Sequence, residues 1–241
     1  MPPNPAPDPE TALRGAIADC LDRRRTALTE TVRVVAAHKD TVLHQRACAM
    51  AIPMLYAHWE GFAKEALQLY VEFLERSAVA QRDVHANLLA YSWSGSFRKL
   101  SGELTHERKV EVIERFLGSL TDVLAFEQRE REIDTKSNLF FKVLEGLARC
   151  LCLDIEPMRD HRQKLDALVN RRNNIAHGGR EQALDDSDIE DYRNLVLRLM
   201  EALEGVLGTA VQAASFRRAP PPAAAAPTPA LPGAPPPGGH T

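Results

Sequence analysis

The chain has 241 residues, of which 44% are hydrophobic and 6% aromatic, and its formal net charge is −3. This length and hydrophobic content suffice for one large domain or two small ones with a sizeable core. The weakly negative charge excludes a generally basic coat for nucleic acid, so any phosphate-binding surface has to be local. Leucine and alanine dominate the expected interior positions, which favours helices over sheets.

The first third of the chain predicts two long helices behind a leader. Residues 1–9 carry five prolines and are expected to be flexible. Apolar residues then recur at steps of three and four, which predicts helices over 10–37 and about 40–76. Pro53 lies inside the second helix and predicts a kink there.

The segment 77–104 is less periodic and is expected to be a long loop. Glycine and serines interrupt its aromatic stretch, Tyr91–Phe97. These aromatic side chains either stack on the bases of single-stranded RNA or hold the loop against the bundle.

The rest of the chain predicts four more helices and a tail. Ser187 and Glu190 have the spacing of a capping box at the start of the last helix. Residues 219–241 hold nine prolines, which predicts a disordered tail over 214–241 after one helical domain over 10–213. The four expected helices cover residues 105–126, 137–153, 157–173 and 187–213. A charged, solvated turn is expected over 127–134, between the first two of these helices.

Several classes of protein have no support in the sequence. No phosphate-binding loop, dinucleotide-binding glycine motif, zinc-protease motif or nucleophile elbow is present, and no carboxylates and histidines have metal-ligand spacing, so no cofactor and no metal are expected. No hydrophobic run reaches ~18 residues, so no membrane span is expected. The four cysteines lack zinc-finger spacing and are expected to be buried free thiols of a cytoplasmic protein: Cys20, Cys48, Cys150 and Cys152.

Positive charge gathers in one stretch. Between Pro157 and Arg180, six basic residues and two acids give a local charge of +4. Such a patch attracts phosphate, although an exposed helix face of mixed charge has the same composition. Arg162, Arg171 and Arg180 are therefore candidates for binding RNA.

Within this stretch, Arg172 is followed directly by Asn173 and, five positions on, by His177. Arginine presents a planar, permanently charged fork that suits a phosphate, and histidine exchanges a proton near neutral pH. On an unbroken helix, however, five residues turn the chain by about 140°, which points the two side chains apart. Either the helix breaks, near Asn173 and Asn174 or at Gly178 and Gly179, or two subunits share the site across a two-fold axis.

This motif resembles the R-x4-6-H signature of the HEPN superfamily of all-helical nucleases and RNA-binding domains, with Arg172, Asn173 and His177 at its three polar positions. Two further stretches resemble the MAE-like HEPN proteins of bacterial defence and toxin systems: Tyr56–Lys64 and Ile133–Leu139. The resemblance implies an all-α, HEPN-like up-and-down helical bundle with extra helices. It also implies a metal-independent endoribonuclease that acts as a homodimer.

The residues suggest a mechanism for this activity. His177 takes the proton from a ribose 2′-hydroxyl or protonates the leaving oxygen, Arg172 holds the scissile phosphate, and Asn173 orients the histidine or the phosphate. The alternative is a structural motif in which Arg172 pairs with a carboxylate and His177 closes a helix end. The protein would then be a non-catalytic scaffold for RNA or a partner protein. A third hypothesis is a toxin silenced by an antitoxin or by modification of the motif. An antitoxin or a defence-system protein would then be its partner.

Overall fold

The computed structural model describes residues 8–100, 105–178 and 183–218. Within these ranges the chain is helical, and its only extended pairings are two isolated bridges, Ala80 with Val123 and Val84 with Arg217. The predicted all-α fold is therefore confirmed.

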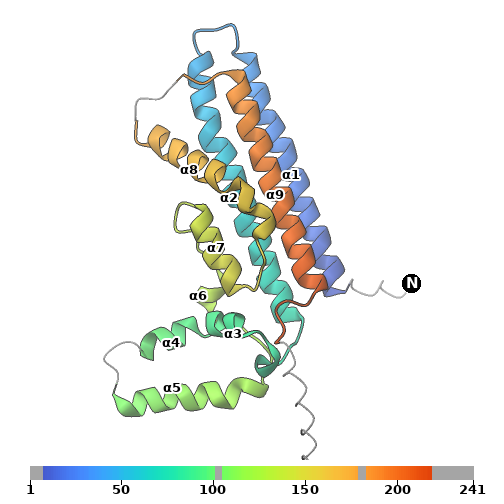
Figure 1. Ribbon diagram of the computed structural model, residues 1–241, viewed down its shortest axis with the longest axis vertical. Coiled ribbons are helices and arrows are strands. Elements are labelled where there is room, and N and C mark those ends of the chain that lie inside the picture. The colour runs from blue at the N-terminus through green and yellow to red at the C-terminus, as the bar shows by residue number, and fades with distance from the viewer. Residues whose placement is uncertain (1–7, 101–104, 179–182, 219–241) are drawn as a thin grey trace, which may run out of the picture.

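Three long helices form the frame of the molecule: α1 (Pro9–Ala37), α2 (His44–Arg76) and α9 (Asp186–Gln212). They pack along their lengths, with α1 running opposite to α2 and α9 (Figure 1). The side chain of Asp8 caps α1 by accepting two backbone N–H groups, with a proline next to it. The second helix begins at His44, a few residues later than expected.

The core follows the inner face of α2, which contacts α1, α8 (Arg162–Ala176) and α9. Trp59 is fully buried there, which confirms it as a core residue. Burying a side chain of this kind stabilises the fold by roughly 1.5–3 kcal/mol. Other large side chains fully buried on the same helix are Tyr56, Phe62, Leu67 and Tyr70.

Shorter elements fill the chain between α2 and α8. They are η1 (Gln81–Asp83), α3 (Ala86–Ser92), α4 (Ser94–Leu100), α5 (His106–Gly118), η2 (Ser119–Thr121), α6 (Gln128–Arg131), α7 (Phe141–Cys150) and η3 (Glu156–His161). In Figure 1, α4 and α5 form an arm that extends away from the long helices.

The expected loop over 77–104 is wrong, because its aromatic part lies in α3 and α4. Trp93 donates its Nε1–H to Gln81 Oε1 at 2.7 Å, and Tyr91 packs against Phe126 at 6.0 Å between ring centroids. These two rings hold the segment against the rest of the chain, so they are not free to stack on bases.

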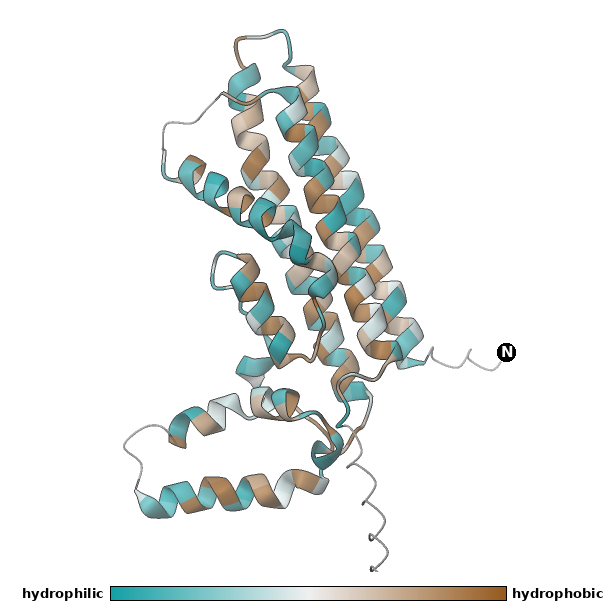
Figure 2. Cartoon of the chain, in the orientation of Figure 1, coloured by the Kyte–Doolittle hydropathy of each residue, from teal (hydrophilic) through white to brown (hydrophobic). Residues whose placement is uncertain are grey.

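The helix expected over 105–126 is also wrong in extent and in orientation. It ends as α5 at Gly118, and none of its residues is buried. Val110, Ile113 and Leu117 are exposed, and Figure 2 shows apolar residues along this outlying helix. The expected solvated turn that follows also departs from the prediction, because Glu130 is buried and accepts hydrogen bonds from Ser94 and Arg98.

The later boundaries differ by a few residues. The fourth expected helix starts only at Phe141, and the fifth continues past residue 173 to Ala176. The capping box of α9 is formed by Asp185 and Asp188, two residues before the predicted pair. The packed chain extends past residue 213, since Phe216 is buried and packs edge-on against Phe73.

Two expectations concern the environment of the protein. Across the residues placed by the structure, no helix is both long enough and apolar enough to cross a membrane. All four cysteines are free: Cys20 and Cys48 are buried, as predicted, whereas Cys150 and Cys152 are half-buried.

Candidate functional site

The three stretches that carry the family resemblance meet in space. Tyr56 and Glu60 lie one turn apart on α2, and both bind the segment that precedes α7. The Tyr56 hydroxyl accepts the backbone N–H of Leu139 at 2.7 Å, and the Glu60 carboxylate accepts the hydroxyl of Thr135 at 2.7 Å. Glu60 therefore belongs to this junction.

Arg172 joins the junction from α8. Its Nη1 donates to Asn173 Oδ1 at 2.8 Å and to Asn138 Oδ1 at 3.3 Å. Its guanidinium carbon lies 5.1 Å from the centre of the Tyr56 ring, within the range of a cation–π contact. Thus one half-buried cation is oriented by groups from all three stretches.

The partners of Arg172 are neutral. No carboxylate of residues 8–100, 105–178 or 183–218 lies within ion-pair distance of its guanidinium. This contradicts, for the part of the chain in view, the alternative in which Arg172 pairs with a carboxylate. A positioned guanidinium whose charge is not neutralised by a neighbour suits an external anion such as a phosphate.

The turn that presents Asn138 to Arg172 is unusual. Lys136 and Ser137 both have left-handed backbone conformations, with φ of 56° and 63°. Each such conformation costs on the order of 1 kcal/mol or more for a residue other than glycine. Asp134 supports the turn, because its carboxylate accepts the backbone N–H and the ammonium group of Lys136.

Tyr56 acts in this site as a neutral group. Burial raises the pKa of its hydroxyl to about 12, an effect that the carboxylate of Glu60 reinforces. At neutral pH the phenol therefore stays protonated. Its chemistry here is to receive a backbone hydrogen bond and to offer a ring face to Arg172.

His177 is the C-cap of α8, and its imidazole is exposed. Its backbone N–H donates to the carbonyl of Asn173 at 3.0 Å, and Gly178 then turns the chain away with φ of 72°. Because the helix is continuous from Arg162 to Ala176, the predicted break near Asn173 and Asn174 is wrong, whereas the alternative break at Gly178 is confirmed. On ideal helix geometry, Arg172 and His177 point about 140° apart around the axis.

The three candidate RNA-binding arginines fall in different places. Arg171 neighbours the site and lies over the ring of Tyr192, at 5.8 Å. Arg162 lies in the first turn of α8, about 15 Å along the axis from Arg172 at ~1.5 Å per residue, so the structure does not bring it to the motif. Arg180 lies outside the described residues.

A groove of about 840 Å³ runs between α1 and α2 and reaches the motif helix. Its wall includes Ile175, which lies on α8 between Arg172 and His177. His58 also lines it; burial lowers the pKa of this imidazole, and its Nδ1 has no hydrogen-bond partner. Exposed apolar side chains dominate the rest of the wall: Val34, Leu43, Met50 and Met54.

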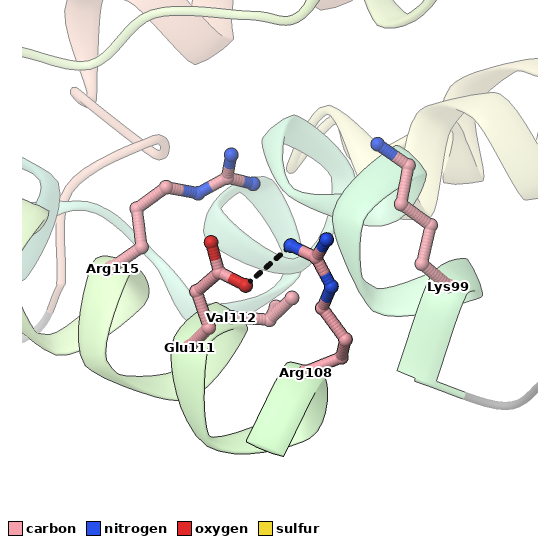
Figure 3. Close-up of a pocket in the computed structure, with 5 residues that line it drawn as sticks. All are labelled: Lys99, Arg108, Glu111, Val112 and Arg115. Carbon is pink, nitrogen blue, oxygen red and sulfur yellow. Dashed lines mark hydrogen bonds and ion pairs between the residues drawn. The ribbon is translucent and has the colours of Figure 1, made fainter. Parts of the chain in front are cut away.

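A second hollow, of about 310 Å³, lies in the arm between α4 and α5 (Figure 3). Arg108 pairs with Glu111 at 2.8 Å across its floor, and Arg115 lies over the ring of Trp93 at 5.2 Å. Lys99 lines the same hollow. The two arginines here are engaged by neighbours within the arm, so the hollow is a weaker anion site than Arg172.

Among the residues that the structure describes, one group of side chains could bind a metal ion, and the sequence did not predict it. His44 and Cys48 of α2 and Asp186 of α9 place one ligand atom each within 4.8 Å of one another. Sequence spacing could not predict this cluster, because Asp186 is far from His44 and Cys48 along the chain. It lies at the starts of α2 and α9, and none of its members belongs to the Arg172 junction.

An all-helical bundle that ends one helix with Arg-Asn and a histidine has the features of HEPN domains. The family model HEPN_MAE_28990-like HEPN matches residues 14–211, and the chain belongs to this family. No curated protein and no solved structure matches the chain. Membership of a HEPN family supports a nuclease or another RNA-related role.

Proposed function

We propose that this protein is a metal-independent endoribonuclease of the HEPN type that acts as a homodimer. Arg172, Asn173 and His177 are its proposed catalytic residues. The observation that supports this most directly is the state of Arg172: a half-buried guanidinium, held by Tyr56 and two asparagines, with no carboxylate partner among the residues the structure describes. A purely structural arginine at this depth would be expected to have an acidic partner.

The chemistry uses the ribose as its own nucleophile. His177 removes the proton of the 2′-hydroxyl, and the 2′-oxygen attacks the adjacent phosphorus. The bond to the 5′-oxygen breaks, water returns a proton to that oxygen, and a 2′,3′-cyclic phosphate remains. Arg172 binds the non-bridging oxygens and stabilises the charge that they gain in the transition state.

Asn173 acts through Arg172 in this proposal. Its side-chain oxygen accepts from the guanidinium, while its backbone carbonyl accepts the N–H of His177. One residue thus links the charge clamp to the turn that carries the imidazole. Its amide NH₂ remains as a donor to the phosphate.

A second copy of the chain is needed because the two catalytic side chains diverge on α8. The groove beside Ile175 is the proposed docking surface, since it is apolar, exposed and contiguous with the motif helix. A two-fold axis at Ile175 would bring His177 of each subunit to Arg172 of the other.

The substrate strand is expected to follow positive charge near the motif. Arg171 neighbours Arg172, and Arg180 and Arg162 extend the same basic stretch of sequence. These side chains would bind phosphates without reading bases, so their loss should weaken RNA binding for all sequences alike.

The test is cleavage of single-stranded RNA in EDTA, at a temperature where the metal-free protein is folded. Wild type should cut, whereas His177→Ala and Arg172→Ala should lose about 10²–10⁴-fold in rate. The matched controls are His161→Ala and Arg159→Ala, which remove the same side chains just before α8 and should cut normally. A substrate with 2′-deoxyribose throughout should resist. Equal cutting by wild type and His177→Ala would refute the assignment.

The second candidate function is a scaffold that binds a partner protein, favoured by the exposed apolar side chains of α5. A silenced toxin of a defence system combines both ideas, with an antitoxin as the partner. Expression of the chain alone distinguishes them. A nuclease toxin should slow growth, with relief by Arg172→Ala, whereas a scaffold should have no such effect.

A further inference from the structure

We propose that His44, Cys48 and Asp186 form a structural zinc site that joins the start of α2 to the start of α9. His44 and Cys48 are four residues apart on α2 and therefore share one face of the helix. Asp186 is the first residue of α9 and reaches the same point. Imidazole, thiolate and carboxylate are the three ligand types that zinc accepts in proteins.

The two distances from His44 Nε2 to the other ligand atoms match those around a tetrahedral ion. His44 Nε2 lies 3.4 Å from Asp186 Oδ1 and 3.7 Å from Cys48 Sγ. With bonds of ~2.0–2.1 Å to nitrogen and oxygen and ~2.3 Å to sulfur, tetrahedral angles give about 3.3 Å between N and O and about 3.6 Å between N and S. The side chains would need only small adjustments to bind the ion.

The same groups are poorly satisfied by one another as hydrogen-bond partners. Asp186 Oδ1 is buried and accepts no hydrogen bond, and the separation of 3.4 Å from His44 Nε2 exceeds that of a good N–H···O bond. Buried polar atoms normally have partners, so the unpartnered Asp186 Oδ1 indicates a ligand between the side chains.

Charge and access also favour a cation. The start of α9 carries three carboxylates, those of Asp185, Asp186 and Asp188, and that of Asp186 lies beside Cys48. Lys39 holds the outer oxygen of Asp186 at 3.1 Å, which leaves Oδ1 free to bind in a monodentate manner. Cys48 is fully buried, whereas the side chain of Asp186 is 37% exposed and provides a path for entry.

The ion would reinforce an existing junction between the two helices. Gln45, next to His44, donates to the backbone carbonyl of Leu184 at 2.9 Å and accepts its N–H at 3.2 Å. Both contacts fix the point where the chain enters α9 after the motif helix α8. Three protein ligands leave one coordination position of the ion for water. We assign the ion a structural role because none of its ligands belongs to the Arg172 junction.

The experiment uses the full chain, stripped with chelator and then titrated with Zn²⁺ or Co²⁺. Wild type should bind one equivalent, and bound Co²⁺ should show the charge-transfer band of a cobalt–thiolate bond. At a Zn²⁺ concentration of ~100 Kd, the melting temperature should rise by about 5–10 °C. These readouts do not depend on RNA cleavage, so their failure leaves the ribonuclease proposal untouched.

Two pairs of variants decide the outcome. Cys48→Ala should abolish the cobalt band, whereas Cys20→Ala removes an equally buried free thiol of α1 and should keep it. Asp186→Asn retains the cap of α9 provided by Asp185 and should weaken Zn²⁺ binding at least tenfold, even if Cys48→Ala does not fold. The proposal is overturned if wild type binds no stoichiometric metal, or if binding survives Asp186→Asn and Cys48→Ala unchanged.

Discussion

The divergence of Arg172 and His177 on one helix makes a quantitative prediction about mixed dimers. If each site takes its arginine from one subunit and its histidine from the other, neither Arg172→Ala nor His177→Ala homodimers contain an intact site. A dimer of one Arg172→Ala subunit and one His177→Ala subunit contains one intact site and one empty of both groups. Co-refolding the two inactive variants should therefore restore cleavage.

The expected recovery follows from random pairing. Equal amounts of the two variants give mixed dimers as about half of the population, each with one of two sites intact, so the rate should reach about one quarter of wild type. The separate variants should remain ~10²–10⁴-fold below wild type. Recovery would thus exceed either variant alone by more than an order of magnitude.

The assay is the initial rate of cleavage of a fluorescent RNA after co-refolding and removal of monomer. The matched control mixes wild type with the double variant Arg172→Ala/His177→Ala. Shared sites predict about one quarter of the wild-type rate for this control, whereas sites within one subunit predict about one half. A mixture of the single variants that stays inactive, together with a control at one half, would refute the shared site.

Three further substitutions test the surroundings of the motif. Tyr56→Phe leaves a buried backbone N–H without its acceptor and should lower the free energy of unfolding by about 1–3 kcal/mol, measured with denaturant. Because burial raises the pKa of Tyr56 from 10.0 to about 12, the difference in unfolding free energy between wild type and variant should shrink as pH rises over that range. A difference that stays constant with pH would contradict this. Met50→Asp, at a groove residue 65% exposed, should dissociate the dimer in sedimentation without destabilising the subunit, whereas Val42→Asp, 100% exposed outside the groove, should not. Asn138→Asp places a carboxylate beside Arg172 and should raise KM for RNA at least several-fold, measured by steady-state cleavage; an unchanged KM would show that Arg172 does not bind the phosphate.

The long helices were predictable because their sequence signals are local. Asp8, with a proline after it, starts α1 in the sequence and in the structure alike. The stripe through Trp59 and Phe62 is long enough to predict a buried face of α2. α2 continues through Pro53 as a single helix, and the kink expected there stays a prediction.

The middle of the chain was not predictable because its structure depends on contacts between distant residues. Gly95 and three serines suggest a loop, but Ser96 is buried and bonded to Glu127, and Trp93 is bound by Gln81. Conversely, the spacing of apolar residues in α5 predicts that one face of this helix is buried, yet none of its residues is buried. Such spacing does not reveal whether another part of the same chain covers that face. Local pattern identifies an amphipathic helix, and tertiary context decides its burial.

In the candidate site too, contacts between sequence neighbours were predictable, whereas contacts between distant residues were not. The pairing of Arg172 with Asn173 is between neighbours and could be expected, although the sequence left open whether Asn173 orients the histidine or the phosphate. Its contacts with Asn138 and Tyr56 join three stretches far apart in sequence, and only the resemblance singled out two of these stretches. The capping box of α9 was misplaced because the run before Ile189 contains several overlapping pairs of the right type.

Because the partners of Arg172 are neutral, the site can bind an anion strongly. Holding the guanidinium there without an anion, however, destabilises the free protein. A guanidinium taken partly out of water without a counter-ion costs free energy, and the ring of Tyr56 and two amide oxygens offset only part of it. A bound phosphodiester supplies the missing negative charge, so its binding offsets this free-energy cost. The stabilisation grows as negative charge develops on the phosphate oxygens in the transition state. The strained turn at Lys136 and Ser137, which holds one of those amides in place, is consistent with a site organised for a ligand rather than for the fold.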